Sequence, residues 1–528
     1  MTLEYVNPLD KETRRRLLDA TSFLREIAAA PELLNDLEPE LKVDLLKAAG
    51  DVFCPDPAVR RRRAKVLRNQ RRTQKLKRDE DILDRTGIRL LRAKPVFTTP
   101  DVSAPQAFEQ HGVDDALFRE TADAQHCYVC KAKYHDVHHF YDQLCPSCAQ
   151  LNFAKRGELA EMIGMVALLT GGRVKIGYQA GIKLLRSGAD LIVATRFPRD
   201  AAERYSAEVD FADWGHRLEV FGLDLRHTPS VEAFCQHILA TRSRLDLIVN
   251  NACQTVRRPP EFYKHMMDNE SAALDVLPEH VLQLVGAYEG LRGYHMLGGD
   301  DPLIMGDAGS AMMPTATDVA GSAAVAGLTH AAKLSQTPLL ADEVNSRGQL
   351  FPKGRLDKDL QQVDLRDHNS WRLLLHEVSS VELLETQLVN AVAPFVLNAR
   401  LKPLMAATPG SHKHVVNVSA VEGQFYRLRK TTRHPHTNMA KAALNMMTRT
   451  SATDFHASGI HMNSVDTGWV SDEDPAAIAE QKTAEHRFHP PLDIVDGAAR
   501  IVDPIIDGLN SGVHVWGQFL KDYAPTDW

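Results

Sequence analysis

The sequence has no apolar run of the roughly 18 residues that a membrane-spanning helix needs. Its first residues, MTLEYVNPLDKETRRR, lack the apolar core of a signal peptide. Only seven of the 528 residues are cysteine, too few for the disulfide scaffold of a small secreted domain. Aromatic residues make up 6%, charged residues 25%, and the formal net charge is −7, as in ordinary globular proteins. We therefore expect a cytoplasmic protein with no membrane partner.

The chain is too long for one compact core, so we expect several structural units. Apolar residues at helical spacing predict a helical N-terminal region over 1–110, and two cysteine pairs predict a small metal-binding module over 120–155. From 158 to 528, short apolar strands alternate with helical patterns, which predicts an α/β fold with a Rossmann-type, doubly wound parallel sheet. A long insertion, about 254–380, interrupts it and is typical of a lid, a binding element or a linker. The expected strands are 165–170, 190–196, 218–225, 245–252, 414–420, 460–468 and 513–520.

A glycine-rich turn, Thr170-Gly171-Gly172-Arg173-Val174-Lys175-Ile176-Gly177, follows the first expected strand and opens a helix. Glycines in such a turn let backbone N–H groups approach a pyrophosphate at the positive end of the helix. Strand, turn, helix and second strand follow in the order that dinucleotide binding requires.

At these residues the chain resembles the short-chain dehydrogenase/reductase superfamily, whose turn reads T-G-x-x-x-G-I-G. Thr170, Gly171, Ile176 and Gly177 match that pattern, whereas Lys175 stands at the middle glycine, which predicts a displaced turn or an altered phosphate contact. Further resembling segments follow in family order: Asp224-Leu225 for the adenine contact, Asn250-Asn251-Ala252-Cys253 for N-N-A-G, VNAVAPFVL around Asn390, and NSVDTGW, in which Thr467 replaces the proline before Gly468. The resemblance implies a nicotinamide-dependent oxidoreductase that commonly assembles as a homodimer or homotetramer.

Arg196 ends the second strand, where members that select NAD usually place an acid for the ribose hydroxyls. An arginine there accommodates a 2′-phosphate instead, and Arg173 and Lys175 add positive charge nearby. We therefore expect NADP(H), with NAD(H) as the alternative if these are only solvated loop charges.

The family's four catalytic positions are only half matched. Asn390 and Lys441 stand at the family's catalytic Asn and Lys, but Thr437 replaces the tyrosine and Ala420 replaces the serine. Ser419 lies one residue away, and adjacent strand residues point to opposite faces. An aliphatic alcohol is a far weaker acid than a phenol, so Thr437 is a poor substitute. Other candidate proton donors are His434, His436, Tyr426, and His330 or Tyr294 from the insertion.

Two functions remain open at this point. The first is an NADP(H)-dependent oxidoreductase with a non-standard site, acting on an unknown carbonyl or alcohol. The second is a catalytically inactive NADP(H) sensor or scaffold, because Lys441 also binds the nicotinamide ribose in the family and Asn390 has an architectural role there.

Two C-x-x-C pairs, Cys127/Cys130 and Cys145/Cys148, are separated by 14 residues. Each pair aims two thiolates at one ion, and together they complete a tetrahedral Zn²⁺ shell. Four sulfurs leave no open position, so the zinc is expected to be structural, although His126, His135, His138 and His139 are neighbours that could replace a ligand.

The segment from Arg60 to Arg78 holds eleven Lys or Arg residues and no aromatic residue. It is interpreted as a solvated helix face balanced by the acidic DEDILD that follows, because base-stacking side chains are absent. The alternative is a surface for nucleic acid or an acidic protein partner.

Overall fold

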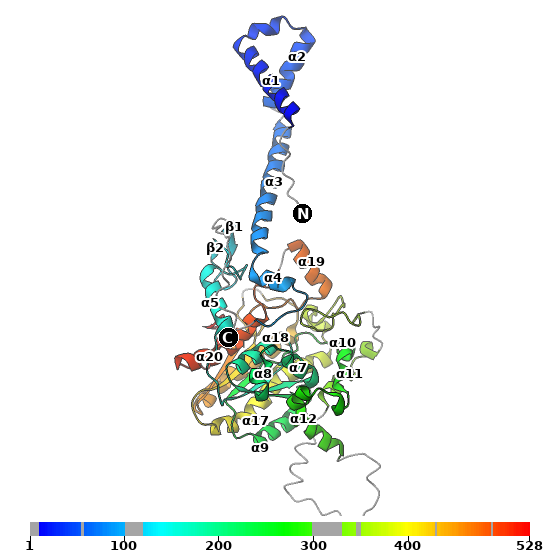
Figure 1. The fold of residues 1–528 in the computed structure, drawn as a ribbon, viewed down its shortest axis with the longest axis vertical. Helices are drawn as coiled ribbons and strands as arrows, with labels where there is room; N and C mark the ends of the chain where they lie inside the picture. The colour runs from blue at the N-terminus through cyan, green and yellow to red at the C-terminus, as the bar shows by residue number, and fades with distance from the viewer. Residues whose placement is uncertain are drawn as a thin grey trace, which may run out of the picture. The chain divides into compact units, whose positions relative to one another are not determined.

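A computed structural model describes residues 10–53, 57–100, 120–297, 330–344, 350–427, 430–486 and 489–528 (Figure 1). The chain divides into two compact units, Met1–Glu80 and Asp81–Trp528. None of the helices in the described ranges is both long and apolar enough to cross a membrane.

The first unit is helical, which confirms the prediction for this region. It contains α1 (Lys11–Ala29), the 3₁₀ helix η1 (Pro31–Asn35), α2 (Pro39–Phe53) and most of α3 (Pro57–Leu83). The start of α1 is set by Asp10, whose carboxylate accepts a hydrogen bond from the Thr13 backbone N–H at 2.7 Å. The basic segment lies on α3, where Arg61, Arg62 and residues 64–78 are exposed. Exposure fits both interpretations of this segment, so its partner stays a prediction.

The second unit begins with a small module that carries the four cysteines. Its elements are α4 (Gly87–Ala93), the antiparallel strands β1 (Glu120–His126) and β2 (Lys133–Asp136), and α5 (Pro146–Gly157).

The main sheet has eight strands in the order β10-β9-β8-β7-β6-β3-β4-β5, and all neighbours are parallel except β9 and β10. The first strand of this sheet along the chain is the central strand β3. Strands β4 and β5 follow on one side of it, and β6 to β10 follow on the other. This reversal leaves a crevice at the carboxyl ends of β3 and β6, where doubly wound sheets bind their ligands. The strands are β3 (Val166–Thr170), β4 (Asp190–Thr195), β5 (Leu218–Gly222), β6 (Leu247–Asn250), β7 (Lys413–Ser419), β8 (Ile460–Asp466), β9 (Phe519–Lys521) and β10 (Ala524–Thr526).

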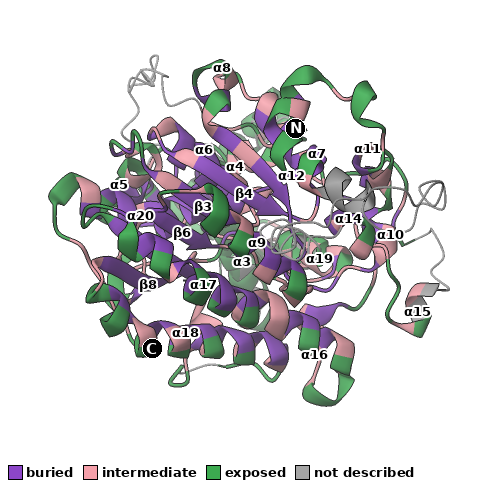
Figure 2. Ribbon diagram, turned by 90° about the horizontal axis from the view of Figure 1, so that it is seen from below, coloured by how far each residue is buried: buried purple, intermediate pink, exposed green. Residues whose placement is uncertain are grey.

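Helices cover both faces of the sheet, so its strands are buried while the outer helix surfaces are exposed (Figure 2). Leu169 and Val193 contribute to one apolar core, which includes residues of α6, α7, α12 and α20. Leu168 and Ile192 contribute to the other, with α9, α17 and α18. The doubly wound α/β fold is thereby confirmed. The helical elements of the sheet domain outside the insertion are α6 (Lys175–Arg186), α7 (Pro198–Ser206), α8 (Phe211–Trp214), η3 (Gly215–Arg217), α9 (Thr228–Thr241), α16 (Ser380–Gln387), the π-helical turn η9 (Leu388–Val392), α17 (Ala393–Ala407), η10 (Val421–Gly423), α18 (Pro435–His456), α19 (Ala476–His486) and α20 (Ile494–Ser511).

The described parts of the insertion are mostly helical. The segment α12 packs against β5, where Tyr288 fills the space beside Gly222. Phe262 and Tyr263 pack with Phe197 of the sheet domain in a separate apolar cluster. Most of the small-residue stretch predicted to be a loop, 307–332, lies outside the described residues. The helical elements are α10 (Pro260–Tyr263), η4 (Lys264–Met266), α11 (Met267–Glu270), η5 (Leu274–Val276), α12 (Glu279–Leu297), α14 (Ala331–Leu334), α15 (Ala341–Val344), η7 (Ser370–Arg372) and η8 (Leu375–Glu377).

The expected last strand, 513–520, was wrong in its extent. Gly517 has φ of 66°, a left-handed conformation that breaks an extended run, and β9 begins only at Phe519. The antiparallel edge strand β10 was not predicted.

Five histidines gather at the amino ends of β7 and β8. His412 Nδ1 lies 2.9 Å from His514 Nε2, and His514 Nδ1 lies 3.0 Å from His414 Nε2. The rings of His461 and His514 stack at 4.5 Å, and His456 lies beside His461. Burial, followed by the neighbouring histidines, lowers the pKa of His414 and lowers that of His514 to about 4.

We expect this cluster to make the fold sensitive to acid. The pKa values of these histidines in the folded state lie below the unfolded value of about 6.5. Their contribution to the free energy of unfolding is therefore fully present above pH 6.5 and is lost as the pH drops toward 4. Urea unfolding at pH 7.5 and pH 5.0 measures the loss. His514→Gln is expected to reduce it, and an identical loss in the variant would contradict this assignment.

Candidate nucleotide-binding site

The glycine-rich turn adopts the conformation that its glycines allow. Gly171 has φ of 71°, and a Cβ there would lie 2.8 Å from the Cα of Ala252. A Cβ on Gly177 would lie 2.2 Å from the Gly171 carbonyl oxygen. Asn251 Nδ2 donates to the carbonyls of Thr170 and Gly171 at 3.1 Å, and the Ala252 N–H donates to the Thr170 hydroxyl at 3.1 Å. The carboxyl end of β6 therefore fixes the turn.

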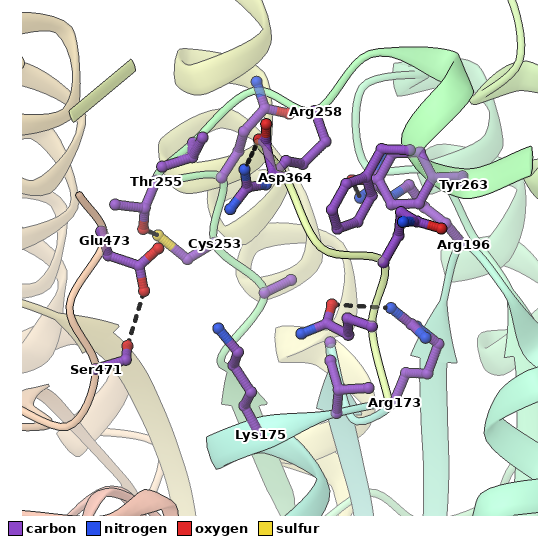
Figure 3. A pocket seen from close by; sticks show the side chains of 18 of the residues that line it. Arg173, Lys175, Arg196, Cys253, Thr255, Arg258, Tyr263, Asp364, Ser471 and Glu473 are labelled. Carbon is purple, nitrogen blue, oxygen red and sulfur yellow. Dashed lines mark hydrogen bonds and ion pairs between the residues drawn. The ribbon is translucent and has the colours of Figure 1, made fainter. Parts of the chain in front are cut away.

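Lys175 lies in the turn with a left-handed backbone conformation. Its φ is 55°, the left-handed conformation that glycine adopts most easily, and α6 starts at this residue. Burial would lower the pKa of the ammonium, but the nearby carboxylates of Glu473, Asp359 and Asp357 outweigh it and raise the pKa. The side chain extends into the cavity above the turn (Figure 3). A left-handed non-glycine residue costs about 1–2 kcal/mol, and such strain clusters at functional sites.

Comparing Lys175→Gly with Lys175→Ala separates the effect of this backbone strain from the effect of the charge. Because glycine also gains more freedom in the unfolded chain, we expect the free energy of unfolding to change by less than about 1 kcal/mol. If Lys175 contacts the phosphate of the predicted NADP(H), the dissociation constant for NADPH should rise about tenfold in this variant, because a charged hydrogen bond would be lost. Lys175→Ala is the matched control, since it removes the charge and keeps the backbone strain. Unchanged NADPH affinity in both variants would contradict a phosphate contact.

A cavity of about 620 Å³ lies over the carboxyl ends of the central strands. It is lined by residues of the turn, of the ends of β4, β5 and β6, of the insertion and of the loop after β8. The predicted cofactor residues that line it are Gly171, Arg173, Lys175, Ile176, Gly177, Arg196, Asp224, Leu225, Asn251 and Ala252. Thr170, Lys441, Thr467 and Gly468 do not line it, although Thr170 supports the turn and Ser471, close after Gly468, is on the wall.

Two arginines converge at the end of the cavity where the predicted adenosine contacts lie. Arg196 donates to the Tyr263 hydroxyl at 2.7 Å, and its guanidinium lies 4.6 Å from the centre of that ring (Figure 3). Arg226 pairs with the Asp224 carboxylate at 2.6 Å. Burial alone would raise the pKa of Asp224, but Arg226 and then Arg196 outweigh it and hold the pKa low. Sequence reasoning missed Arg226, whose only signal was its position two residues after Asp224, and Tyr263, which the insertion supplies.

Arg173, predicted to add positive charge near the cofactor, lines the cavity but has its own partners. Its guanidinium pairs with Asp200 at 2.7 Å and donates to Gln361 of the insertion at 3.3 Å. Arg258, which pairs with Asp364, adds a further positive charge to the wall from the insertion (Figure 3). The insertion therefore forms part of the cavity.

The predicted catalytic residues lie outside the cavity lining. Lys441 is buried, and its ammonium donates to the Val418 carbonyl at 2.7 Å. Asn390 sits in the π-helical turn η9, where its amide exchanges hydrogen bonds with the Gln254 backbone at 2.7 and 3.2 Å. The hydroxyls of Thr437 and Ser419 are buried without a hydrogen-bond partner.

The other candidate proton donors in the described ranges do not line the cavity either. His434 stacks on Trp371 with ring centres 3.8 Å apart, and His436 is buried 3.5 Å from a Glu382 oxygen. Tyr426 is 98% exposed. His330 is described but lies away from the wall, and the side chain of Tyr294 lies outside the described residues.

The four cysteines of the module come together. The Sγ atoms of Cys127, Cys130, Cys145 and Cys148 all lie within 4.8 Å of one another. Cys130 Sγ and Cys145 Sγ are 3.6 Å apart, against the roughly 3.8 Å expected between sulfurs of a tetrahedral site with 2.3 Å bonds. The residues thus fit a structural zinc ion. Among the described residues this is the one such group of potential metal ligands, and it does not include the neighbouring histidines.

Two family models match the chain, one before residue 275 and one after residue 368. Residues 165–274 match the short chain dehydrogenase model, and residues 369–492 match the enoyl-(acyl carrier protein) reductase model. The unmatched stretch between them falls within the insertion.

Individual relatives are distant or partial. An uncharacterized protein, R665, of Acanthamoeba polyphaga mimivirus is 28% identical over 408 residues, which span 75% of this chain and 74% of the relative. Human retinol dehydrogenase 14 is 34% identical over 109 residues, 18% of this chain and 32% of that enzyme. The chain thus spans only about a third of that curated dehydrogenase.

Solved structures show a remote likeness. A dehydrogenase/reductase from Sinorhizobium meliloti has 15% identity and a TM-score of 0.40, covering 70% of this chain and 97% of that one. The chain is thus similar to short chain dehydrogenases over residues 165–274 and to enoyl-(acyl carrier protein) reductases over residues 369–492.

Proposed function

We propose that the cavity binds NADP(H) and that the protein is a short-chain type oxidoreductase with a non-standard catalytic site. One observation carries the proposal: the cavity is lined both by the glycine turn and by Arg196 after β4, and an arginine at the end of this strand can accommodate a 2′-phosphate. NAD(H), which lacks that phosphate, would not use the positive charge that Arg196 places at this end of the cavity.

The side chains on the wall have defined tasks in this proposal. The turn from Gly171 to Gly177 presents backbone N–H groups to the pyrophosphate, and the Lys175 ammonium adds positive charge there. Arg196 and Arg226 hold the 2′-phosphate, and Tyr263 orients Arg196 through its hydroxyl. NADP(H) supplies or accepts the hydride when it is bound.

Proton transfer is the step for which this chain lacks the family's groups. Positioned acid–base groups typically contribute about 10² to 10⁴ in rate. Thr437 cannot replace a phenol, and its hydroxyl is buried. We infer that the protein reduces ordinary ketones and aldehydes slowly. Its own substrate is inferred to be another carbonyl compound or an alcohol.

A second candidate function is NADP(H) binding without turnover. The specific observation that favours it is the absence of Thr437, Lys441, His434 and His436 from the wall of the cavity. In that case the domain would act as a sensor or scaffold, and the basic segment of α3 would be a surface for an acidic partner.

An NADPH fluorescence titration followed by a carbonyl and alcohol substrate screen distinguishes the two. Turnover of any substrate class supports the oxidoreductase. Tight NADPH binding without turnover across ketones, aldehydes and alcohols supports the second candidate. No affinity for NADP(H) or NAD(H) in folded protein would refute both.

We also propose that the four-cysteine group holds a structural Zn²⁺ ion. A closed sulfur shell would hold the two C-x-x-C turns of the module together. Metal analysis of purified protein should find about one zinc per chain, and a variant with Cys127→Ser and Cys130→Ser should lose it.

A further inference from the structure

The cysteine module holds the start of the loop that follows β8. The Trp469 backbone N–H donates to the Tyr128 hydroxyl at 3.0 Å, and Tyr128 directly follows Cys127. The same hydroxyl lies 3.6 Å from the position of a Cβ on Gly468. The metal ligand and the loop are thus joined through one side chain.

The module and α4 also hold the far end of this loop. Gln143 Nε2 donates to the His489 carbonyl at 2.8 Å, and Arg92 donates to the Leu492 carbonyl at 2.7 Å. The Leu492 N–H in turn donates to the Trp469 carbonyl at 3.3 Å, which closes the loop on itself. We call residues 469–486 and 489–492 the cavity segment.

Apolar packing reinforces both anchors. Cys127 and Cys145 are members of one buried cluster together with Val470 and Leu492 of the cavity segment. Two of the four metal ligands therefore pack in the same core as the two ends of the segment. The other buried members are Ile88, Tyr134, Phe140, Tyr141, Leu144, Ala149, Ile494 and Val495.

Between its anchors, the cavity segment forms one wall of the nucleotide cavity. Residues from Ser471 to Ala476, with Ala479 and Glu480, line it. Glu473 is the carboxylate that contributes most to raising the pKa of Lys175. Ser471 lies only two residues beyond the N–H that Tyr128 holds. A shift of the cysteine module must therefore move the wall that faces the glycine turn.

We propose that the four-cysteine site is the device that positions the cavity segment, so that nucleotide affinity depends on whether the metal is bound. Tyr128 is the positioning residue that links the two. The inference rests on the proposed zinc site and on the proposed NADP(H) site, and it adds the coupling between them.

The test uses the full chain and removes zinc with a chelator, with release verified by metal analysis. Hydrogen exchange of residues 469–486 is expected to speed up, while that of residues 218–241, on the opposite part of the sheet, stays unchanged. The dissociation constant for NADPH should rise on the order of tenfold. Adding Zn²⁺ back should restore both values, which general unfolding would not allow.

A hydroxyl deletion tests the link itself. Tyr128→Phe should retain zinc and raise the NADPH dissociation constant roughly two- to tenfold, the range for one lost hydrogen bond. Tyr134→Phe is the matched control, because its hydroxyl donates to the Asp142 carbonyl inside the module at 2.8 Å and does not reach the cavity segment.

The outcomes separate the two proposals. Zinc release with unchanged exchange in 469–486, or a folded protein that binds no zinc at all, overturns the coupling. Faster exchange on zinc release in a protein that never binds NADPH supports the positioning role and refutes the nucleotide proposal instead.

Discussion

Replacing Arg196 by glutamate is expected to raise the dissociation constant for NADPH by about 100-fold or more and to change that for NADH by only a few fold. A charged hydrogen bond to phosphate contributes about 1.5–3 kcal/mol, and the new carboxylate adds repulsion of the 2′-phosphate. Arg226 stays in place and limits the loss, because it lies at the same end of the cavity. Fluorescence titrations with the two cofactors measure the change in preference.

Arg449→Glu is the control for this experiment. It makes the same change in net charge on the exposed surface of α18, away from the cavity lining. Its affinities for both cofactors should stay within about twofold, as expected of an exposed, solvent-screened charge outside the cavity lining. If Arg196→Glu lowers the affinity for NADPH and for NADH equally, this arginine does not bind the 2′-phosphate.

The second large effect is expected from restoring the family's catalytic pair, with Thr437→Tyr and Ala420→Ser together. If Lys441 and Asn390 still define a working site, carbonyl reduction should rise by about 10² to 10⁴ over the natural protein. Thr437 is 3% exposed, so the larger ring is also expected to cost about 1–3 kcal/mol of stability. Reduction rates on an aldehyde panel at saturating NADPH measure the gain.

Thr437→Phe with Ala420→Ser is the matched variant, since it has the same ring without the phenol. Activity in the tyrosine variant but not in the phenylalanine variant would show that only proton transfer was missing. Equal inactivity of two folded, NADPH-binding variants would show that the cavity does not bring the nicotinamide to Lys441, which favours binding without turnover.

Local patterns in the sequence determined much of this protein. Apolar strands alternating with helices predicted the doubly wound sheet, since a parallel strand buried on both faces must be almost wholly apolar. The spacing of the two cysteine pairs predicted a group that the fold brings together, because a C-x-x-C turn places two thiols side by side. The turn from Gly171 to Gly177 could be predicted because its strand, glycines and helix are consecutive in the sequence, although the end of β6 fixes its conformation.

Other features were decided only by the tertiary structure. Tyr263, Arg258 and Asp364 reach the cavity wall from the insertion, which has no periodic pattern that places it beside β4. Arg173 was predicted to add positive charge near the cofactor, and the fold pairs it with Asp200, 27 residues away. The contact of Tyr128 with Trp469 joins residues 341 positions apart. Packing of distant segments sets such contacts, and a sequence pattern reports only on neighbours along the chain.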